Sequence, residues 1–169
     1  MTISVAGYER CVCCGRRRPH CLCDGELAFE ENGKKIRLTL RSDEEGVALV
    51  LDGCVFRDDE PKCDGLFLWK KGTSKKYAIL VELKVVDIEQ AFKQIAYVRS
   101  NRLEYRQIVE TFMSDVGTST VVEKAVIVSN GTLTKPQWVK FENQFGFRVL
   151  PVLDSDATTR VTDARELCR

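Results

Sequence analysis

The middle of the chain alternates between apolar runs and short polar breaks, and this pattern predicts a strand pair followed by a helix. Residues 66–69 and 77–86 are largely apolar, a lysine-rich turn separates them, and two charged side chains interrupt the second run. From Ile88 onward, apolar residues recur every three or four positions, as they do on one face of a helix. We therefore expect a β-hairpin that leads into one long helix over residues 87–113.

The segments on either side of this hairpin and helix carry weaker patterns of the same kinds. Alternating apolar residues and turn dipeptides predict strands at 36–41, 47–51, 54–56, 125–129 and 147–153. Residues 135–145 have the pattern of a second helix, in whose first turn Pro136 is tolerated. Residues 24–32 are acidic and could hold one or two helical turns. The order of elements predicts an α/β protein with a mixed sheet and helices packed on its faces.

The composition is that of a globular domain. Of the 169 residues, 44% are hydrophobic and 30% are charged, which is enough for a substantial core. The net charge of +1 gives no global attraction to nucleic acids. No apolar stretch reaches the roughly 18 residues of a membrane span, and the start of the chain lacks the pattern of a signal peptide. We therefore expect an intracellular, cytoplasmic protein that does not enter a membrane.

Glu82 and Lys84 are the charged pair inside the second apolar run, and their spacing places them on one face of a strand. Asp64 precedes the first strand of the hairpin, so it could supply a second carboxylate, and two carboxylates suit Mg2+ or Mn2+. Lys84 could then orient or deprotonate a water molecule. Gln94 lies on the second turn of the following helix, within reach of the strand end. The alternative is that Glu82 and Lys84 form a solvated stripe on a half-exposed strand.

These residues, in this order, resemble the PD-(D/E)XK nuclease superfamily. The most similar branch reads Cys-Asp, a strand, Glu-Leu-Lys, and then Asp-Ile-x-x-Ala-Phe-x-Gln-Ile. In this chain the three motifs are residues 63–64, 82–84 and 87–95, within about a fifth of the sequence. The superfamily places a proline directly before its first aspartate, whereas Pro61 stands three residues before Asp64.

The resemblance implies a restriction-endonuclease-like αβββαβ core, with a mixed sheet flanked by helices. Asp64 and Glu82 would be metal ligands, together with the backbone carbonyl of Leu83. Lys84 would be the catalytic lysine and Gln94 a supporting helix residue. The implied activity is hydrolysis of DNA phosphodiester bonds with Mg2+ or Mn2+, as an endo- or exodeoxyribonuclease. Two alternatives keep the fold: a catalytically inactive nucleic-acid-binding module of a larger assembly, and a homodimeric enzyme resembling Holliday-junction resolvases.

A cysteine-rich segment, residues 11–23, contains five cysteines and the only histidine of the chain. Cysteines at this density in an intracellular chain favour a closed tetrahedral zinc site over disulfides. The expected zinc ligands are Cys11, Cys14, Cys21 and Cys23, with Cys13 or His20 as substitutes. Disulfides stay open as an alternative, as does an iron–sulfur cluster that includes Cys168. We thus divide the chain into a metal-binding knuckle at 1–30 and a nuclease-like domain at 31–169.

Two charged segments near the predicted site have open interpretations. The predicted long helix carries Arg99, Arg102 and Arg106 on one face, which could contact a nucleic-acid backbone or pair with nearby glutamates. The acidic run at 58–60 fits a solvated turn before Pro61, although one of its members could be a third acid of the site.

Overall fold

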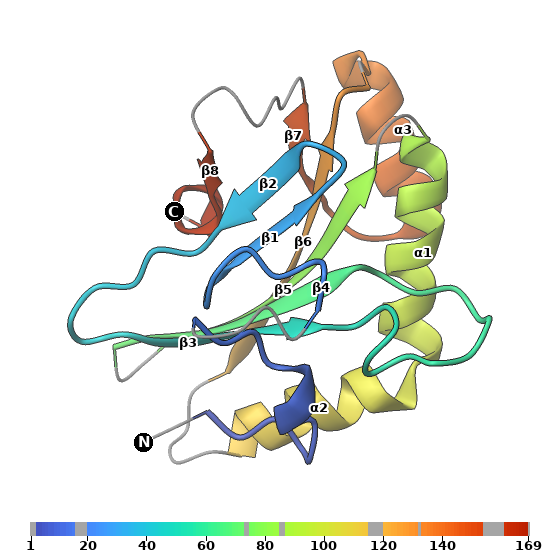
Figure 1. Ribbon diagram of the computed structural model, residues 1–169. Helices are drawn as coiled ribbons and strands as arrows, with labels where there is room; N and C mark the ends of the chain where they lie inside the picture. Colours follow the sequence, from blue (N-terminus) through green and yellow to red (C-terminus); the bar gives the residue numbers. More distant parts are fainter. Residues whose placement is uncertain are drawn as a thin grey trace.

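The computed structural model is built around a five-stranded mixed sheet (Figure 1). It describes residues 3–15, 20–72, 75–84, 87–114, 120–131, 133–153 and 161–168. In spatial order, the strands of this sheet are β3 (Glu45–Val50), β4 (Gly65–Lys71), β5 (Lys75–Lys84), β6 (Val121–Ser129) and β7 (Leu150–Leu153). The pairs β3–β4 and β4–β5 are antiparallel, whereas β5–β6 and β6–β7 are parallel. The predicted hairpin and the predicted α/β class with a mixed sheet are confirmed.

Among the described residues, three α-helices flank this sheet: α1 (Ile88–Asn101), α2 (Leu103–Ser114) and α3 (Lys135–Phe145). Helices α1 and α2 bury apolar stripes, and α1 contacts β5, β6 and α3, beside which it lies in Figure 1. Helix α3 has the predicted bounds because both of its ends carry local signals. Thr134 forms a capping box with Gln137, and Gly146 takes a left-handed conformation after the last turn.

The prediction of a single helix over residues 87–113 is wrong at Arg102. There the backbone leaves helical geometry, with φ of −87° and ψ of 106°, and α2 begins at the next residue. The apolar periodicity continues through the break, because Val98 before it and Tyr105 after it are both buried. The pattern of apolar residues therefore could not locate the end of α1. The break coincides with the burial of the Arg102 side chain against a loop, described below.

A second sheet of three strands packs on the other face of the large sheet. It consists of β1 (Ala28–Glu31), β2 (Lys34–Arg37) and β8 (Thr162–Asp163), in the order β1-β2-β8. Phe29 of β1 lies so close to β4 that a Cβ atom at Gly65 would be 2.6 Å from the Phe29 ring. The Phe29 ring also contacts the ring of Phe67, with centroids 4.7 Å apart. The glycine at position 65 thus allows the small sheet to approach the large one.

Residues 28–56 differ from the prediction in several places. Residues 28–31 form a strand instead of helical turns, and the Asn-Gly turn at 32–33, with φ of 50° and 75°, is the local signal for this hairpin. Residues 54–56 form a turn, and β2 ends at Arg37. The predicted domain boundary at residue 30 falls inside β1.

Short 3-10 helices lie at Glu9–Cys11 and Ala164–Cys168. No described helix is long and apolar enough to cross a membrane.

Candidate active site

The pairing of β4 with β5 places Asp64 beside Glu82. Gly65 pairs with Val81, and one step further along both strands stand the two acidic residues. The Leu83 amide donates to Asp64 Oδ2 over 2.7 Å, and the Asp64 amide donates to Glu82 Oε2 over 3.2 Å. Residues opposite each other in an antiparallel pair share a face of the sheet. The two carboxylates therefore lie side by side at one end of the hairpin.

The face that carries Glu82 is the one covered by the helices. Side chains alternate along a strand, so Lys76 and Glu82 of β5 share a face. Lys76 Nζ donates to the Phe112 carbonyl of α2 over 2.9 Å, which identifies this face. The candidate site thus lies on the helical face at the carboxyl end of β5, the end at which α/β sheets commonly bind ligands.

Glu82 is almost completely buried, with 1% of its surface exposed, between Val81 at 0% and Leu83 at 4%. A buried carboxylate is costly without compensation, and the Asp64 amide supplies one hydrogen bond to it. Mg2+ is commonly bound by one or two carboxylates, with water and substrate phosphate completing its shell. Two carboxylates and the Leu83 carbonyl fit such an ion. Among the described residues, no group of three or more His, Cys, Asp or Glu side chains is placed to hold a metal.

The end of β6 lies next to this site. Lys84, the last residue of β5, pairs in register with Ser129 of β6. The side chain of Lys84 lies outside the described residues, so its catalytic role stays a prediction. Ser129 is fully buried and accepts a hydrogen bond from the Gly131 amide over 2.8 Å. A Cβ atom at Gly131 would lie 2.9 Å from Ile88, so this turn packs on the first residue of α1. Ser129 is not among the site residues predicted from the sequence, although it is a polar residue that ends an apolar strand.

Gln94 has a buried side-chain oxygen with no hydrogen-bond partner among the described residues. It precedes Tyr97 by nearly one helical turn, so both residues project from neighbouring positions on α1. The Tyr97 hydroxyl donates to Glu60 Oε2 over 2.9 Å, in the loop that leads into Asp64. Gln94 therefore lies on the side of α1 that borders this loop. An unsatisfied buried oxygen is uncommon, and it fits a position at which a ligand or a water molecule binds.

Arg102 is not part of an exposed basic face, and Asp58 is not a third acid of the site. The Arg102 side chain is 5% exposed, and its guanidinium donates to both carboxylate oxygens of Asp58, over 2.7 and 2.8 Å. This bidentate pairing lowers the pKa of Asp58 to about 2. Arg99 stacks over the Phe147 ring, 5.1 Å from its centroid. The predicted arginine face is therefore largely occupied by contacts within the protein.

The cysteine-rich segment is cross-linked differently from the predicted zinc site. Cys11 forms a disulfide with Cys54, and Cys13 forms one with Cys23. A sulfur atom in a disulfide has no thiolate with which to bind zinc. The structure therefore does not assemble the predicted ligand set of Cys11, Cys14, Cys21 and Cys23. Cys54 was missed because it lies 43 residues from its partner and carries no local signal. Zinc binding by the reduced chain stays a prediction.

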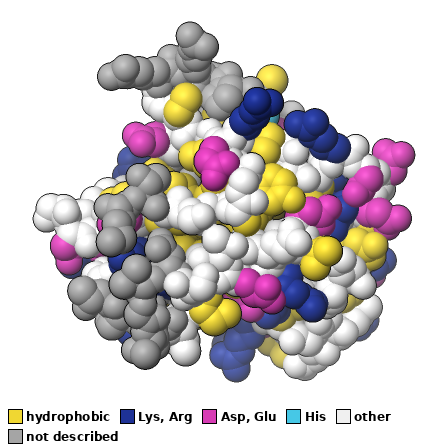
Figure 2. Space-filling view, turned by 90° about the horizontal axis from the view of Figure 1, so that it is seen from below, with side chains coloured by type: hydrophobic (Ala, Val, Ile, Leu, Met, Phe, Trp, Pro, Cys, Tyr) yellow, Lys and Arg dark blue, Asp and Glu magenta, His cyan; other side chains and the backbone are white. Residues whose placement is uncertain are grey.

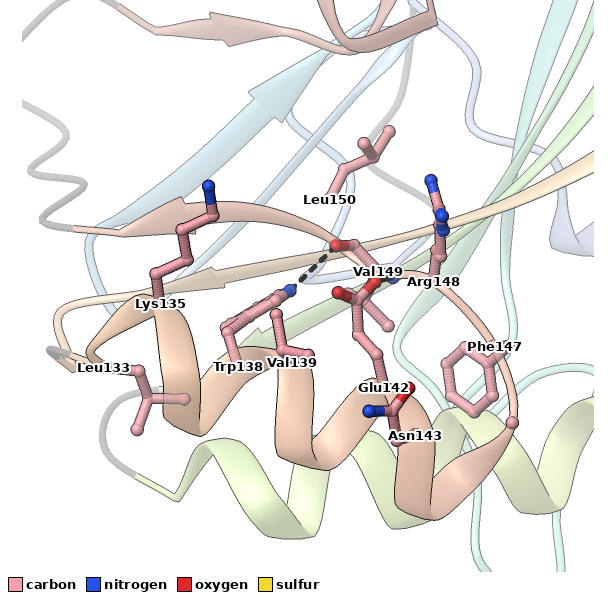
Figure 3. Close-up of a pocket in the computed structure, with 11 residues that line it drawn as sticks. Leu133, Lys135, Trp138, Val139, Glu142, Asn143, Phe147, Arg148, Val149 and Leu150 are labelled. Atoms are coloured by element: carbon pink, nitrogen blue, oxygen red, sulfur yellow. Dashed lines mark hydrogen bonds between the residues drawn. The ribbon is translucent and has the colours of Figure 1, made fainter.

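A separate hollow of about 920 Å³ lies between α3 and the segment that leads into β7 (Figure 3). Its lining is mainly apolar, and Trp138 is held there by a hydrogen bond from its indole nitrogen to a backbone carbonyl over 3.2 Å. Lys135 and Arg148 project at its rim in Figure 3. Neither Asp64 nor Glu82 lines this hollow, so it is distinct from the candidate site.

Charge is mixed on the face shown in Figure 2, where acidic and basic side chains of the described residues lie side by side. This mixture agrees with a net charge of +1 for the whole chain. Nucleic-acid backbones are bound mainly through concentrated positive charge. The described part of this face therefore shows no concentration of positive charge.

No protein-family model, curated protein or solved structure matches this chain. The chemistry of the site follows from its own geometry: two adjacent carboxylates, one of them buried, at the end of a strand pair. This arrangement can bind a hard divalent cation and bring it to an anionic substrate.

Proposed function

We propose that the chain is a metal-dependent nuclease that hydrolyses phosphodiester bonds in DNA, with a restriction-endonuclease-like core. The single observation that carries the proposal is the placement of Asp64 beside the buried Glu82 at the carboxyl end of β5. Two adjacent carboxylates are a ligand set by which Mg2+ is commonly bound. The order of β3, β4 and β5, followed by α1 and the parallel strand β6, supports the proposed core.

In this proposal, Asp64 and Glu82 hold Mg2+ or Mn2+, with the Leu83 carbonyl as a third ligand. The hydrogen bond from the Leu83 amide orients the Asp64 carboxylate, and the Asp64 amide orients Glu82. When bound, the metal would supply positive charge that stabilises the charge developing on the phosphate. Lys84 positions and deprotonates the attacking water. Gln94 orients the water or the phosphate through its buried amide.

The test is incubation of the pure protein with linear, single-stranded, nicked and branched DNA in the presence of Mg2+, Mn2+ or a chelator. We expect cleavage of at least one form with either ion and none with the chelator. Asp64→Asn, which keeps the size of the side chain, should remove the activity. Cleavage in the chelator, or equal cleavage by the variant, would exclude this site.

The alternatives give different results in the same experiment. An inactive nucleic-acid-binding module would bind DNA but cleave none of the forms. In that case, calorimetry should detect no Mn2+ binding that is lost in Asp64→Asn. A resolvase-like enzyme would cut branched DNA selectively, and sedimentation should show it as a homodimer.

A further inference from the structure

The side chain of Arg102, at the break between α1 and α2, is directed into the loop before Asp64. Besides its two bonds to Asp58, it donates from Nε to the Pro61 carbonyl over 3.1 Å and from a terminal nitrogen to the Glu60 carbonyl over 2.9 Å. The guanidinium also lies over the ring of Phe56, 4.4 Å from its centroid. One buried cation thus fixes three residues of this loop and the residue at its base.

The loop has a second attachment to the helices and a short path to the candidate site. Tyr97 of α1 donates to the Glu60 carboxylate, so the helical layer holds Glu60 through both its side chain and its backbone. Asp64 follows Pro61 by three residues, a span of at most about 11 Å when fully extended. Because this connection is short, a displacement of Pro61 should also displace Asp64.

We propose that Arg102 is a positioning residue, which holds the loop at 57–63 in the conformation that places the Asp64 carboxylate beside Glu82. Its effect on catalysis rests on the proposed function, whereas its effect on the geometry of Asp64 does not. Loss of the Arg102 contacts should displace Asp64 only in part, because the Asp64 carbonyl also accepts a hydrogen bond from the Leu51 amide over 2.9 Å. Lysine keeps the charge but cannot form the planar bidentate contact, so Arg102→Lys is the informative substitution.

The Leu83 amide reports on this geometry directly, because it donates to the Asp64 carboxylate. Its hydrogen-exchange rate can be measured by NMR and divided by the rate of the Leu80 amide in the middle of β5. This ratio of rates cancels changes in global stability, which affect both amides. We expect this ratio to rise at least about tenfold in Arg102→Lys. Asp58→Asn alters a half-exposed partner of Arg102 and should raise the ratio less. Binding of Mn2+ to the wild type and both variants, measured by calorimetry, should weaken in the same order.

Arg165 provides the matched control. It also pairs bidentately with a carboxylate, Glu44, and lies over an aromatic ring, that of Trp69. Arg165→Gln should lower stability yet leave the Leu83 ratio unchanged. An unchanged ratio in Arg102→Lys, or an equal rise in Arg165→Gln, would overturn the proposal. If the wild type binds no Mn2+, the proposed function fails, and the exchange ratio still decides the role of Arg102.

Discussion

The two ends of β5 each bury a charged side chain on the same face of the sheet, but they surround it in opposite ways. Lys76 and Glu82 are both 1% exposed. Lys76 donates to the carbonyls of Phe112 and Met113 over 2.9 and 3.4 Å, at the carboxyl end of α2, where the helix dipole is negative. Glu82 instead lies beside a second acid, Asp64.

This difference separates a structural charge from a candidate functional one. The cation at the Lys76 end meets oxygen acceptors that α2 cannot satisfy internally, so both sides gain from the contact. The acid at the Glu82 end is brought next to a second acid, and two adjacent carboxylates are a common ligand set for a divalent cation. Substitution at the Lys76 end should consequently act mainly on stability, and substitution at the Glu82 end mainly on activity.

The largest effect is expected for Glu82→Gln, which keeps the shape of the side chain and removes its charge. We expect DNA cleavage to fall at least about a hundredfold, since the metal contributes several kcal/mol of transition-state stabilisation. Stability should change less than activity does, because glutamine keeps the volume of the buried side chain. Cleavage rates and urea unfolding of the same preparations measure both quantities. A variant that cuts at the wild-type rate would remove Glu82 from the site.

Lys76→Met should have the converse effect. Methionine fills a similar volume but leaves the two α2 carbonyls without their charged donor, at a cost of about 2 kcal/mol. Urea unfolding should show this loss, while Mn2+ binding and cleavage stay at wild-type levels at temperatures where the variant is folded. Loss of Mn2+ binding in a folded Lys76→Met protein would contradict the separation of the two ends.

The features that could be predicted from the sequence are those with local signals. The hairpin register follows from two apolar runs and a short turn, and it brings Asp64 to Glu82 one step beyond the Gly65–Val81 pair. The bounds of α3 follow from a capping residue and a terminal glycine. Contacts between distant segments have no such signal, which is why the Cys11–Cys54 disulfide was missed. The end of α1 was missed for the same reason, because it coincides with contacts between Arg102 and a loop 41–44 residues earlier in the chain.

The disulfides should contribute unequally to stability, and the larger contribution belongs to the Glu82 end. Cys54 lies in the turn after β3 whose Leu51 amide holds the Asp64 carbonyl. Cys11–Cys54 closes a separation of 43 residues and Cys13–Cys23 one of 10, so the chain-entropy model gives the first about 1.3 kcal/mol more stabilisation.

Paired substitutions by alanine test this difference. All four cysteines are buried, with at most 7% of the residue exposed, so the packing losses should be comparable. Urea unfolding of Cys11→Ala/Cys54→Ala should show the larger loss, and that of Cys13→Ala/Cys23→Ala the smaller. Equal losses, or about one zinc per chain in elemental analysis of the purified wild type, would argue against these disulfides and for a metal site.

The smallest effect is expected for Gln94→Ala. Its buried amide oxygen makes no hydrogen bond with the described residues, so truncation removes an unsatisfied acceptor and should not lower stability. If the amide orients water or phosphate at the Glu82 end, cleavage should fall severalfold, about 1 kcal/mol in transition-state stabilisation. Gln90→Ala is the matched control, because Gln90 is an exposed glutamine on the same helix. Equal cleavage by the two variants would show that Gln94 serves only to pack α1, and the candidate site would then be confined to the strand ends.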